Sequence, residues 1–331
     1  MKVLLTGGCG YIGSHTAVEL LNKDYEIVII DNLVNSKESV ISDIKKITGK
    51  DVIFYKGDVR DKDLLNKIFN ENEIDSVIHF AGLKAVGESC IKPLDYYDNN
   101  LNSTISLLEV MKDYNCKKIV FSSSATVYGK PDSLPIREDA KLETSNPYGT
   151  TKLMIEYILK DLYKSDNSFD ITILRYFNPI GAHESGLIGE SPNGIPNNLM
   201  PYIVKVATKE YDELKVFGND YDTKDGTGVR DYIHVVDLAL GHVKALEKIS
   251  GSGLNIYNLG TGTGYSVLDI VKTFEEVNNV KVPYKIVDRR PGDIDSCYAD
   301  PTKAYESLGW KANKDLKDMC KDAYNFVNKN K

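Results

Sequence analysis

Short apolar runs alternate with amphipathic stretches through the first half of the chain. The runs are rich in β-branched residues and apolar throughout, which favours strands buried on both faces, and the stretches between them favour crossover helices. This alternation predicts an α/β fold built on a parallel sheet. The predicted strands are Lys2 to Thr6, Glu26 to Ile30, Val52 to Tyr55, Ser76 to Phe80, Lys118 to Ser122 and Asp170 to Arg175.

The pattern changes after Phe177, where glycines and prolines crowd into a short span. Such residues are typical of loops, so we expect a smaller C-terminal α/β lobe to begin there. The sequence therefore predicts two domains, residues 1–177 and 178–331. The apolar run from Leu254 to Leu259 is expected to return to the first sheet, so that the chain recrosses to the first domain around residues 231–262.

A glycine motif follows the first predicted strand and leads into a helical stretch. Gly8, Gly10 and Gly13 satisfy the pattern G-x-G-x-x-G. Glycines there allow a tight turn and a close approach of the backbone to a pyrophosphate, which the N-terminus of the helix then binds. This context indicates a dinucleotide site in a doubly wound sheet of the Rossmann type, and an ordinary glycine-rich turn is the alternative.

Acidic and basic residues follow the next strands. Asp31 ends the second strand, where a carboxylate accepts hydrogen bonds from ribose hydroxyls and repels a 2′-phosphate, so we predict NAD rather than NADP. Asp58 follows the third strand and either meets the adenine or caps the next helix. Lys84 follows the fourth strand, where it either meets a ligand phosphate or ribose or extends into solvent.

Tyr148 and Lys152 form the pattern Y-x-x-x-K, which places both side chains on one face of a helix. The chain has 21 tyrosines, and the same spacing also begins at Tyr114 and Tyr211. Only Tyr148 starts an amphipathic stretch after a proline and follows a buried strand that ends in serines. We therefore predict Tyr148 as a general base, Lys152 as its charged neighbour and Ser124 as a partner of the reacting oxygen. A surface pair is the alternative.

A free tyrosine hydroxyl is a poor base at neutral pH because its pKa is roughly 10. Lowering that pKa by about three units needs roughly 4 kcal/mol, and a lysine ammonium about 4 Å away at an effective dielectric near 20 supplies a free energy of that size. We therefore expect Lys152, helped by an oxidised nicotinamide, to lower the pKa of Tyr148. Tyr148 can then take a proton from a sugar hydroxyl while hydride leaves the same carbon.

Arg230, Arg289 and Arg290 lie in the second predicted domain, far along the chain from the glycine motif. Planar guanidinium groups suit phosphate oxygens. These arginines therefore indicate a second phosphate-bearing ligand, and exposed salt bridges are the alternative for each.

Charge and composition narrow the class of partner. Acidic residues outnumber basic ones 48 to 41, for a formal net charge of −7, which argues against a general surface for nucleic acid or anionic membranes. No apolar run approaches the roughly 20 residues of a membrane span, and the first residues resemble neither a signal peptide nor an anchor, so a cytoplasmic protein is expected. The 5 cysteines and 5 histidines lack metal-ligand spacing, so no metal is expected.

Taken together, the motifs resemble the UDP-glucose 4-epimerases, a family of extended short-chain dehydrogenases. The resemblance covers nearly the whole chain. The segments that carry it are Thr6 to Thr16, Asp31 to Leu33, Asn35 to Ser36, His79 to Ser89, Tyr96 to Asn100, Phe121 to Gly129, Leu174 to Pro179, Gly194 to Tyr202, Phe217 to Tyr221, Asp225 to His234, Arg289 to Arg290 and Gly292 to Asp293.

The resemblance implies a homodimer that binds NAD in the first domain and a UDP-sugar in the second. The implied reaction interconverts UDP-galactose and UDP-glucose, in galactose metabolism, through a 4-keto intermediate. The implied cofactor residues are Gly7, Gly10, Tyr11, Ile12, Gly13, Asp31, Asn32, Leu33, Asn35, Ser36, Asp58, Val59, Phe80, Ala81, Gly82, Lys84, Asn99, Tyr148, Lys152 and Phe177. The implied substrate residues are Lys84, Ser124, Tyr148, Asn178, Asn198, Leu199, Val216, Phe217, Arg230, Arg290, Asp293 and Cys297.

Cys297 departs from the family pattern, because forms restricted to glucose and galactose carry a tyrosine there. The smaller cysteine predicts room for a 2-acetamido group, and hence interconversion of UDP-N-acetylglucosamine and UDP-N-acetylgalactosamine. The alternative is that Cys297 is only a small buried hydrophobe, with Tyr298 partly closing the gap.

Two other functions share part of this pattern. A nucleotide-sugar 4,6-dehydratase uses the same cofactor, tyrosine and lysine, but the resemblance places the dehydratases' Asp-Glu pair at Ala125 and Thr126. A non-catalytic NAD-binding sensor would keep the glycines and Asp31, but it has no need for Tyr148 with Lys152.

Overall fold

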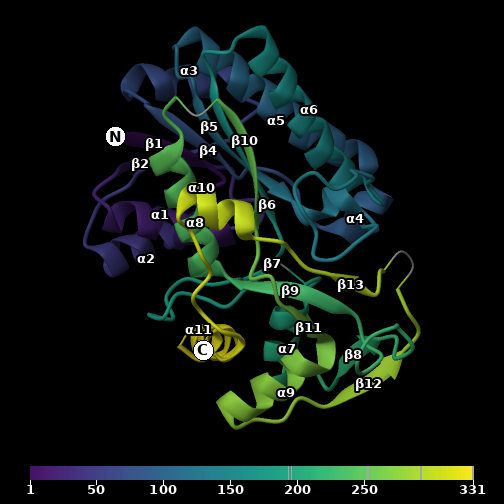
Figure 1. Ribbon diagram of the computed structural model, residues 1–331. Helices are drawn as coiled ribbons and strands as arrows, with labels where there is room; N and C mark the ends of the chain where they lie inside the picture. Colours follow the sequence, from purple (N-terminus) through teal and green to yellow (C-terminus); the bar gives the residue numbers. More distant parts are fainter. Residues whose placement is uncertain (193, 195, 252, 291–292, 330–331) are drawn as a thin grey trace.

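A computed structural model describes the chain except for residues 193, 195, 252, 291, 292, 330 and 331. Ile195, Pro291 and Gly292, which belong to segments considered above, lie outside the described residues. The described elements form a larger lobe around a parallel sheet and a smaller lobe beside it (Figure 1).

The apolar runs form the strands of one parallel sheet in the larger lobe. All the predicted strands are confirmed, with ends that differ by two residues or fewer. The strand order reverses between β1 and β4, which is the kind of switch point where open α/β sheets bind ligands. From one edge to the other, the strands are β10 (Leu254–Leu259), β6 (Asp170–Tyr176), β5 (Lys118–Ser124), β4 (Ser76–His79), β1 (Lys2–Thr6), β2 (Glu26–Asp31) and β3 (Ile53–Lys56).

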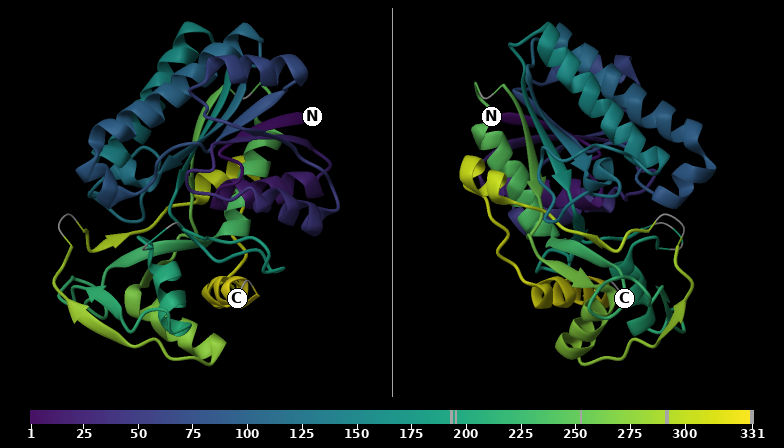
Figure 2. Two further views of the ribbon diagram at one scale, coloured as in Figure 1. Left: turned by 180° about the vertical axis from the view of Figure 1, so that it is seen from behind. Right: turned by 45° about the vertical axis from the view of Figure 1, so that its right-hand side comes forward.

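Helices cover both faces of the sheet, as Figure 2 shows, because each strand buries apolar side chains on both sides. One face carries α1 (Tyr11–Asn22), α2 (Ser39–Thr48), α8 (Val235–Lys248) and α10 (Thr302–Leu308). The opposite face carries α3 (Lys62–Glu71), α5 (Pro93–Asp113) and α6 (Pro147–Ser165). The short helices α4 (Val86–Ile91) and η1 (Ala125–Tyr128) follow β4 and β5.

The chain leaves the larger lobe after β6 and later returns to it. Helix α8 packs on α1, and β10 pairs with β6 along its whole length. This pairing confirms that residues 254–259 form a strand of the first sheet. Residues 302–310 also pack on this lobe, with Trp310 buried in the same core as α8, and the sequence pattern does not predict this second return.

The smaller lobe is organised around β9 (Val229–His234) and a core of its own. Strands β7 (Asn178–Ile180), β11 (Gly264–Ser266) and β13 (Ser296–Cys297) pair with β9. A separate parallel pair consists of β8 (Leu214–Phe217) and β12 (Tyr284–Val287). The helices are α7 (Leu199–Ala207), α9 (Val267–Asn278) and α11 (Leu316–Lys329).

Candidate active site

A cavity of about 1890 Å³ is lined by residues of both lobes at the carboxyl edge of the parallel sheet. Pockets for a single drug-sized ligand are usually about 300–1,000 Å³, so this cavity has room for more than one ligand. All three predicted catalytic residues, Ser124, Tyr148 and Lys152, line it. The other predicted residues that line it are Gly7, Gly10, Tyr11, Ile12, Gly13, Asp31, Asn32, Asn35, Ser36, Asp58, Val59, Phe80, Ala81, Gly82, Lys84, Asn99, Phe177, Asn178, Asn198, Leu199, Val216, Phe217, Arg230, Arg290, Asp293 and Cys297.

Leu33 is a predicted cofactor residue that does not line the cavity. Its backbone has a φ of 61°, its N–H donates to Asp31 at 2.8 Å, and its side chain packs against the core of the larger lobe. The neighbouring Asn32 and Val34 line the cavity instead. The side chain of Leu33 therefore packs on the core, and its assignment as a cofactor residue stays a prediction.

The glycine motif and the preceding Gly7 form the turn between β1 and α1, and two glycines of this turn, Gly7 and Gly13, have no room for a side chain. A Cβ on Gly13 would lie 2.5 Å from the carbonyl oxygen of Gly7 and 2.8 Å from the Cα of Gly8. Gly7 has a φ of +69°, and a Cβ there would lie 2.9 Å from the backbone nitrogen of Ala81. The turn is therefore shaped by backbone contacts, as the close approach of a pyrophosphate requires.

Asp31 is buried at the end of β2 and lines the same end of the cavity. One carboxylate oxygen accepts the N–H of Cys9 at 3.0 Å, and the other accepts the N–H of Leu33 at 2.8 Å and the hydroxyl of Ser36 at 2.9 Å. These partners are neutral donors. They leave an acidic group at the position where a 2′-phosphate would lie, which favours NAD over NADP.

Asp58 is not the cap of the following helix, which is one of the two roles weighed above. Asp61 caps α3 instead, because its side chain accepts the N–H groups of Asp63 and Leu64. Asp58 pairs with Arg60 at 2.9 Å, and its hydrogen bonds with that guanidinium hold its pKa below the usual value. Asp58 is therefore free of helix capping and lines the cavity.

Tyr148 lies in the first turn of α6 at the wall of the cavity. Pro147 begins the helix, and the side chain of Asn146 caps it by accepting the N–H of Gly149 at 2.8 Å. Ser124 ends the neighbouring strand β5, and its side chain forms a hydrogen bond with Tyr148. The structure thus brings the predicted base and its hydroxyl partner together.

Lys152 lies one helical turn after Tyr148 and is buried. Its ammonium donates to the carbonyl oxygen of Ser122 at 2.6 Å and lies 4.9 Å from the centre of the Phe121 ring. Burial disfavours the ammonium and lowers the pKa of Lys152 to about 8. This pKa still lies above 7, so the side chain remains mainly cationic at neutral pH.

The predicted lowering of the Tyr148 pKa is not met in the protein alone. Burial removes the phenolate from water and raises the pKa of Tyr148, and the hydrogen bond with Ser124 offsets only part of that rise. The Lys152 ammonium is directed to the carbonyl oxygen of Ser122 rather than to the phenol. A further positive charge in the cavity would favour the phenolate and oppose this rise in the pKa of Tyr148.

A buried ion pair links helix α6, which carries Tyr148 and Lys152, to the parallel sheet. Glu156 lies one turn after Lys152 on α6, and its carboxylate pairs with Arg175 of β6 at 2.7 Å. Glu156 also accepts the hydroxyl of Ser123 at 2.7 Å, beside Ser124. The pair fixes α6 against the ends of β5 and β6, and the sequence signal for it is the spacing of four residues that continues from Tyr148 through Lys152 to Glu156.

Arg230 and Arg290 lie on the other side of the cavity, in the smaller lobe. The guanidinium of Arg230 donates to the carbonyl oxygen of Ile294 at 2.9 Å and lies 3.6 Å from the carboxylate of Asp293. The guanidinium of Arg290 stacks on Phe217 at 4.0 Å from the ring centre. Both therefore face the cavity with restricted side chains, as a phosphate site requires.

Arg289 fits the other interpretation, that of an exposed salt bridge. It pairs with Asp220 at 2.7 Å, stacks on Tyr221 at 4.0 Å and does not line the cavity. The adjacent arginines 289 and 290 are thus separated by the direction of their side chains, which the sequence does not reveal.

Cys297 lines the cavity from β13, where it pairs in register with Arg230 of β9. Burial raises the pKa of its thiol to about 11, so the side chain is a neutral thiol at neutral pH. Tyr298 points toward Gly264, where a Cβ would lie 3.2 Å from the tyrosine ring, and it does not line the cavity. Tyr298 therefore does not close the space beside Cys297.

Several cavity residues were not predicted from the sequence, among them Tyr176 and Glu190. Tyr176 ends β6, and its hydroxyl forms a hydrogen bond with His242 of α8. Glu190 forms hydrogen bonds with Lys84 and Asn198. A tyrosine at the end of an apolar strand is typical of a core, and Glu190 lies in the glycine-rich and proline-rich segment, so neither carries a local signal.

Among the residues that the structure describes, no helix is long and apolar enough to cross a membrane. The same residues contain no group of three histidines, cysteines or acids that could hold a metal ion.

Comparisons with known proteins agree with this arrangement. A protein-family model described as GDP-mannose 4,6 dehydratase matches residues 4–323. The UDP-glucose 4-epimerase of Bacillus subtilis is 61% identical over 331 residues, which is 100% of this chain and 98% of that relative. The solved structure of the Bifidobacterium longum UDP-glucose 4-epimerase, in complex with NAD+ and UDP, has 57% identity and a TM-score of 0.97, over 100% of this chain and 99% of that one. The Stenotrophomonas maltophila UDP-glucose-4-epimerase, with bound NAD and formylated UDP-arabinopyranose, has 49% identity and a TM-score of 0.98, over 99% and 98%.

The parallel sheet, the glycine turn and the Tyr148 to Lys152 spacing therefore place the chain in the extended short-chain dehydrogenases that modify nucleotide-sugars. Within them, the chain belongs to the UDP-glucose 4-epimerase family.

Proposed function

We propose that the protein is an NAD-dependent isomerase that interconverts UDP-galactose and UDP-glucose. The observation that carries this proposal is a single cavity lined by the glycine turn, by Tyr148 with Ser124, and by Arg230 of the smaller lobe. The similarity to UDP-glucose 4-epimerases over the whole chain supports it. We assign NAD to the larger lobe and the UDP-sugar to the smaller one.

The residues of the cavity supply proton transfer and orientation. Bound NAD supplies the hydride acceptor and a positive charge that favours the phenolate of Tyr148. Tyr148 takes the proton of the C4 hydroxyl as hydride leaves C4, and it returns that proton when hydride is delivered to the opposite face of the sugar. Ser124 hydrogen-bonds the same oxygen in both steps. Because the hydride removed from C4 is returned to C4, no net oxidation occurs.

The arginines of the smaller lobe are suited to bind the diphosphate of the UDP-sugar. Binding energy placed on the nucleotide holds the 4-keto intermediate in the cavity, while weaker contacts with the hexose leave it free to turn over. Arg230 and Arg290 are the two residues that we assign to this role.

The beginning of the 3-10 helix after β5 bears on the dehydratase alternative. Elimination of water needs additional acid and base groups, but Ala125 and Thr126 follow Ser124, and the Thr126 hydroxyl donates to Ser124 at 3.0 Å. Neither residue supplies a carboxylate.

The exposed faces of α4, α5 and α6 support a homodimer. Ile91 and Leu94 are 80% and 79% exposed, although both are large apolar residues. Large apolar side chains exposed on adjacent helices are typical of interfaces with another protein. The others on these helices are Val86, Ile105, Met154 and Tyr157. Sedimentation velocity of the purified protein tests the homodimer directly.

We also propose a cytoplasmic enzyme of galactose metabolism. The cysteines Cys9, Cys90, Cys116, Cys297 and Cys320 are all free thiols, which suits a reducing compartment.

Incubation of the purified protein with UDP-galactose, without added cofactor, tests the proposed reaction. We expect UDP-glucose to form, because the enzyme retains its NAD and regenerates it in each turnover. A 4-keto-6-deoxy product would identify a dehydratase, and the absence of any product would support the sensor. Chromatography of the nucleotide released on denaturation should detect NAD, and mainly NADP would contradict the role of Asp31.

A further inference from the structure

A carboxylate with no role in the reaction above lies inside the cavity. One oxygen of Glu190 accepts a hydrogen bond from the ammonium of Lys84 at 3.2 Å and from the amide of Asn198 at 2.6 Å. The Glu190 side chain is only 9% exposed. Lys84 belongs to the larger lobe and Asn198 precedes α7 in the smaller lobe, so Glu190 joins the two sides of the cavity.

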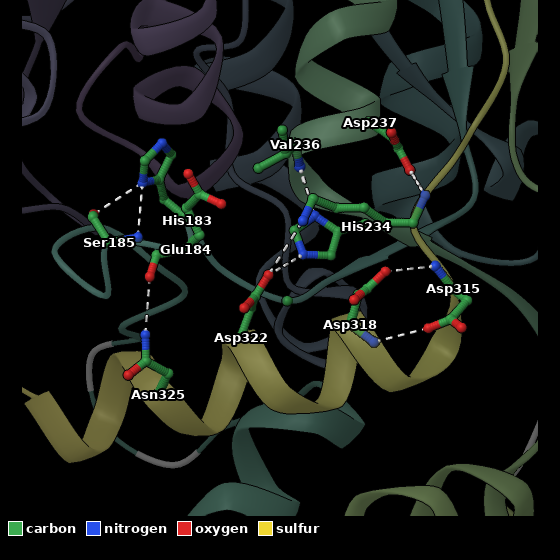
Figure 3. A network of polar contacts seen from close by, with 12 residues as sticks. His183, Glu184, Ser185, His234, Val236, Asp237, Asp315, Asp318, Asp322 and Asn325 are labelled. Atoms are coloured by element: carbon green, nitrogen blue, oxygen red, sulfur yellow. Dashed lines mark hydrogen bonds and ion pairs between the residues drawn. The ribbon is translucent and has the colours of Figure 1, made fainter. Parts of the chain in front are cut away.

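The segment that carries Glu190 is held from outside the cavity. Residues 182–189 form a hairpin, closed by a bridge between its ends. The side chain of Asn325, on α11, donates to the carbonyl oxygen of Glu184 at 3.1 Å, as Figure 3 shows. A Cβ on Gly189 would lie 2.5 Å from the ring of Phe326, so this end of the hairpin also packs directly on α11. These contacts with α11 hold the hairpin in place, and Glu190 follows it directly at the cavity.

Asn198 and Lys84 are two of the residues that we assign to ligands. Asn198 stands at the start of α7, but its side chain makes no hydrogen bond with the helix and donates to Glu190 instead. The Lys84 side chain is 48% exposed and pairs with Glu190. Glu190 thus engages donors that an anionic ligand would also use.

The charge of Glu190 also interacts with Tyr11, a residue of the glycine turn. Tyr11 belongs to that turn, and its hydroxyl donates to the carbonyl oxygen of Gly181 at 2.7 Å. Burial raises the pKa of Tyr11, and the carboxylate of Glu190 raises it further. A cavity proposed to receive two diphosphates therefore contains an anion close to both lobes, where like charges repel.

We propose that Glu190 is an internal substitute for the ligand's diphosphate. Its carboxylate holds Lys84 and Asn198 in position in the ligand-free protein and releases them when the UDP-sugar binds. It therefore weakens the binding of diphosphate ligands and speeds their release. Glu190 is a positioning residue, and it takes no part in proton or hydride transfer. The inference rests on the proposed function and on the family resemblance, which implies that Lys84 and Asn198 contact the ligands.

Glu190→Gln in the full-length holoenzyme isolates the charge, because the amide keeps an oxygen that can accept from Asn198. We expect UDP, measured by calorimetry and as an inhibitor of epimerisation, to bind about five- to tenfold more tightly to this variant at low salt. The gain should shrink at high salt, because screening weakens the repulsion. The affinity for uridine, which lacks phosphate, should not change.

Glu184→Gln is the matched control, since it removes the same charge from the exposed side of the same hairpin. It should leave UDP affinity unchanged, and Glu190→Asp, which retains the charge, should stay near the wild type. If Glu190→Gln binds UDP no more tightly than the wild type, or gains equally for uridine, the substitution role of Glu190 is wrong while the proposed function stands. A wild type that binds no UDP would overturn both.

Discussion

At the glycine turn the polypeptide backbone shapes the cavity, whereas on the opposite side long side chains do so. Gly7 and Gly13 leave no room for a Cβ against neighbouring backbone, so this end has a single available shape. Arg230 and Arg290 instead reach the cavity through long side chains, whose guanidinium groups are held by carbonyl, carboxylate and aromatic groups. The difference suits the proposed reaction, in which a resident cofactor is reused while the substrate is exchanged in each turnover.

Glu156→Gln tests how strongly the buried Glu156–Arg175 ion pair holds α6, for comparison with the glycine turn. The change leaves the Arg175 guanidinium buried without its charged partner, and breaking such a pair typically costs about 3–5 kcal/mol. We expect a loss of that size in the free energy of unfolding, measured by urea denaturation. Glu143→Gln, in an exposed pair with Lys141, should change it by less than about 1 kcal/mol. Equal effects would show that the buried pair does not hold the helix.

Tyr148→Phe tests the chemistry between the two ends of the cavity. Removal of the general base should lower turnover of UDP-galactose at least about 100-fold, while UDP affinity measured by calorimetry should be retained. Tyr114→Phe is the control, because that hydroxyl donates to the carbonyl oxygen of Asn66 away from the cavity. Near-normal turnover in Tyr148→Phe would contradict its assignment as the base.

Arg230→Ala and Arg290→Ala test the side of the cavity that is shaped by long side chains of the smaller lobe. Each should weaken UDP binding by roughly 1.5–3 kcal/mol, because a charge-assisted contact with phosphate is lost. Arg137→Ala, which removes an exposed arginine outside the cavity, should not. Unchanged UDP affinity in the two cavity variants would assign those arginines to structural ion pairing.

Cys297→Tyr tests whether the small side chain at position 297 leaves room for an N-acetyl sugar. We expect the wild type to interconvert UDP-N-acetylglucosamine and UDP-N-acetylgalactosamine, because Tyr298 points away and leaves space beside Cys297. The tyrosine should abolish this activity and largely spare UDP-galactose, since filling the pocket excludes only the larger sugar. Product analysis by chromatography measures both. No turnover of the N-acetyl sugar by the wild type, when UDP-galactose is equilibrated, would refute the role of Cys297.

Local patterns were sufficient where the structure depends on local chemistry. The inner parallel strands are largely apolar because both faces of the sheet are buried, and Leu254–Leu259 carries a similar signal far along the chain. The glycine turn and the start of α6 at Pro147 are likewise set by backbone requirements of neighbouring residues. These features could be predicted from the sequence alone.

Contacts between distant segments could not be predicted in the same way. The direction of the Lys152 ammonium depends on the carbonyl oxygen of Ser122, which another element supplies. Arg289 and Arg290 are adjacent, yet only the packing of each guanidinium on its own aromatic ring separates their roles. Leu33 shows the same limit, because its side chain turns toward the core within a segment that otherwise lines the cavity.

The late return of the chain to the first sheet has a consequence for biosynthesis. The face of α1 that α8 covers, including Ala17, Val18 and Leu21, belongs to a core that also contains Trp310. Because α8 covers this apolar surface, the surface stays exposed on the nascent chain until residues 235–248 have been synthesised. The first 177 residues therefore lack α8 and β10 while they are being synthesised, and apolar surface exposed at that stage favours aggregation.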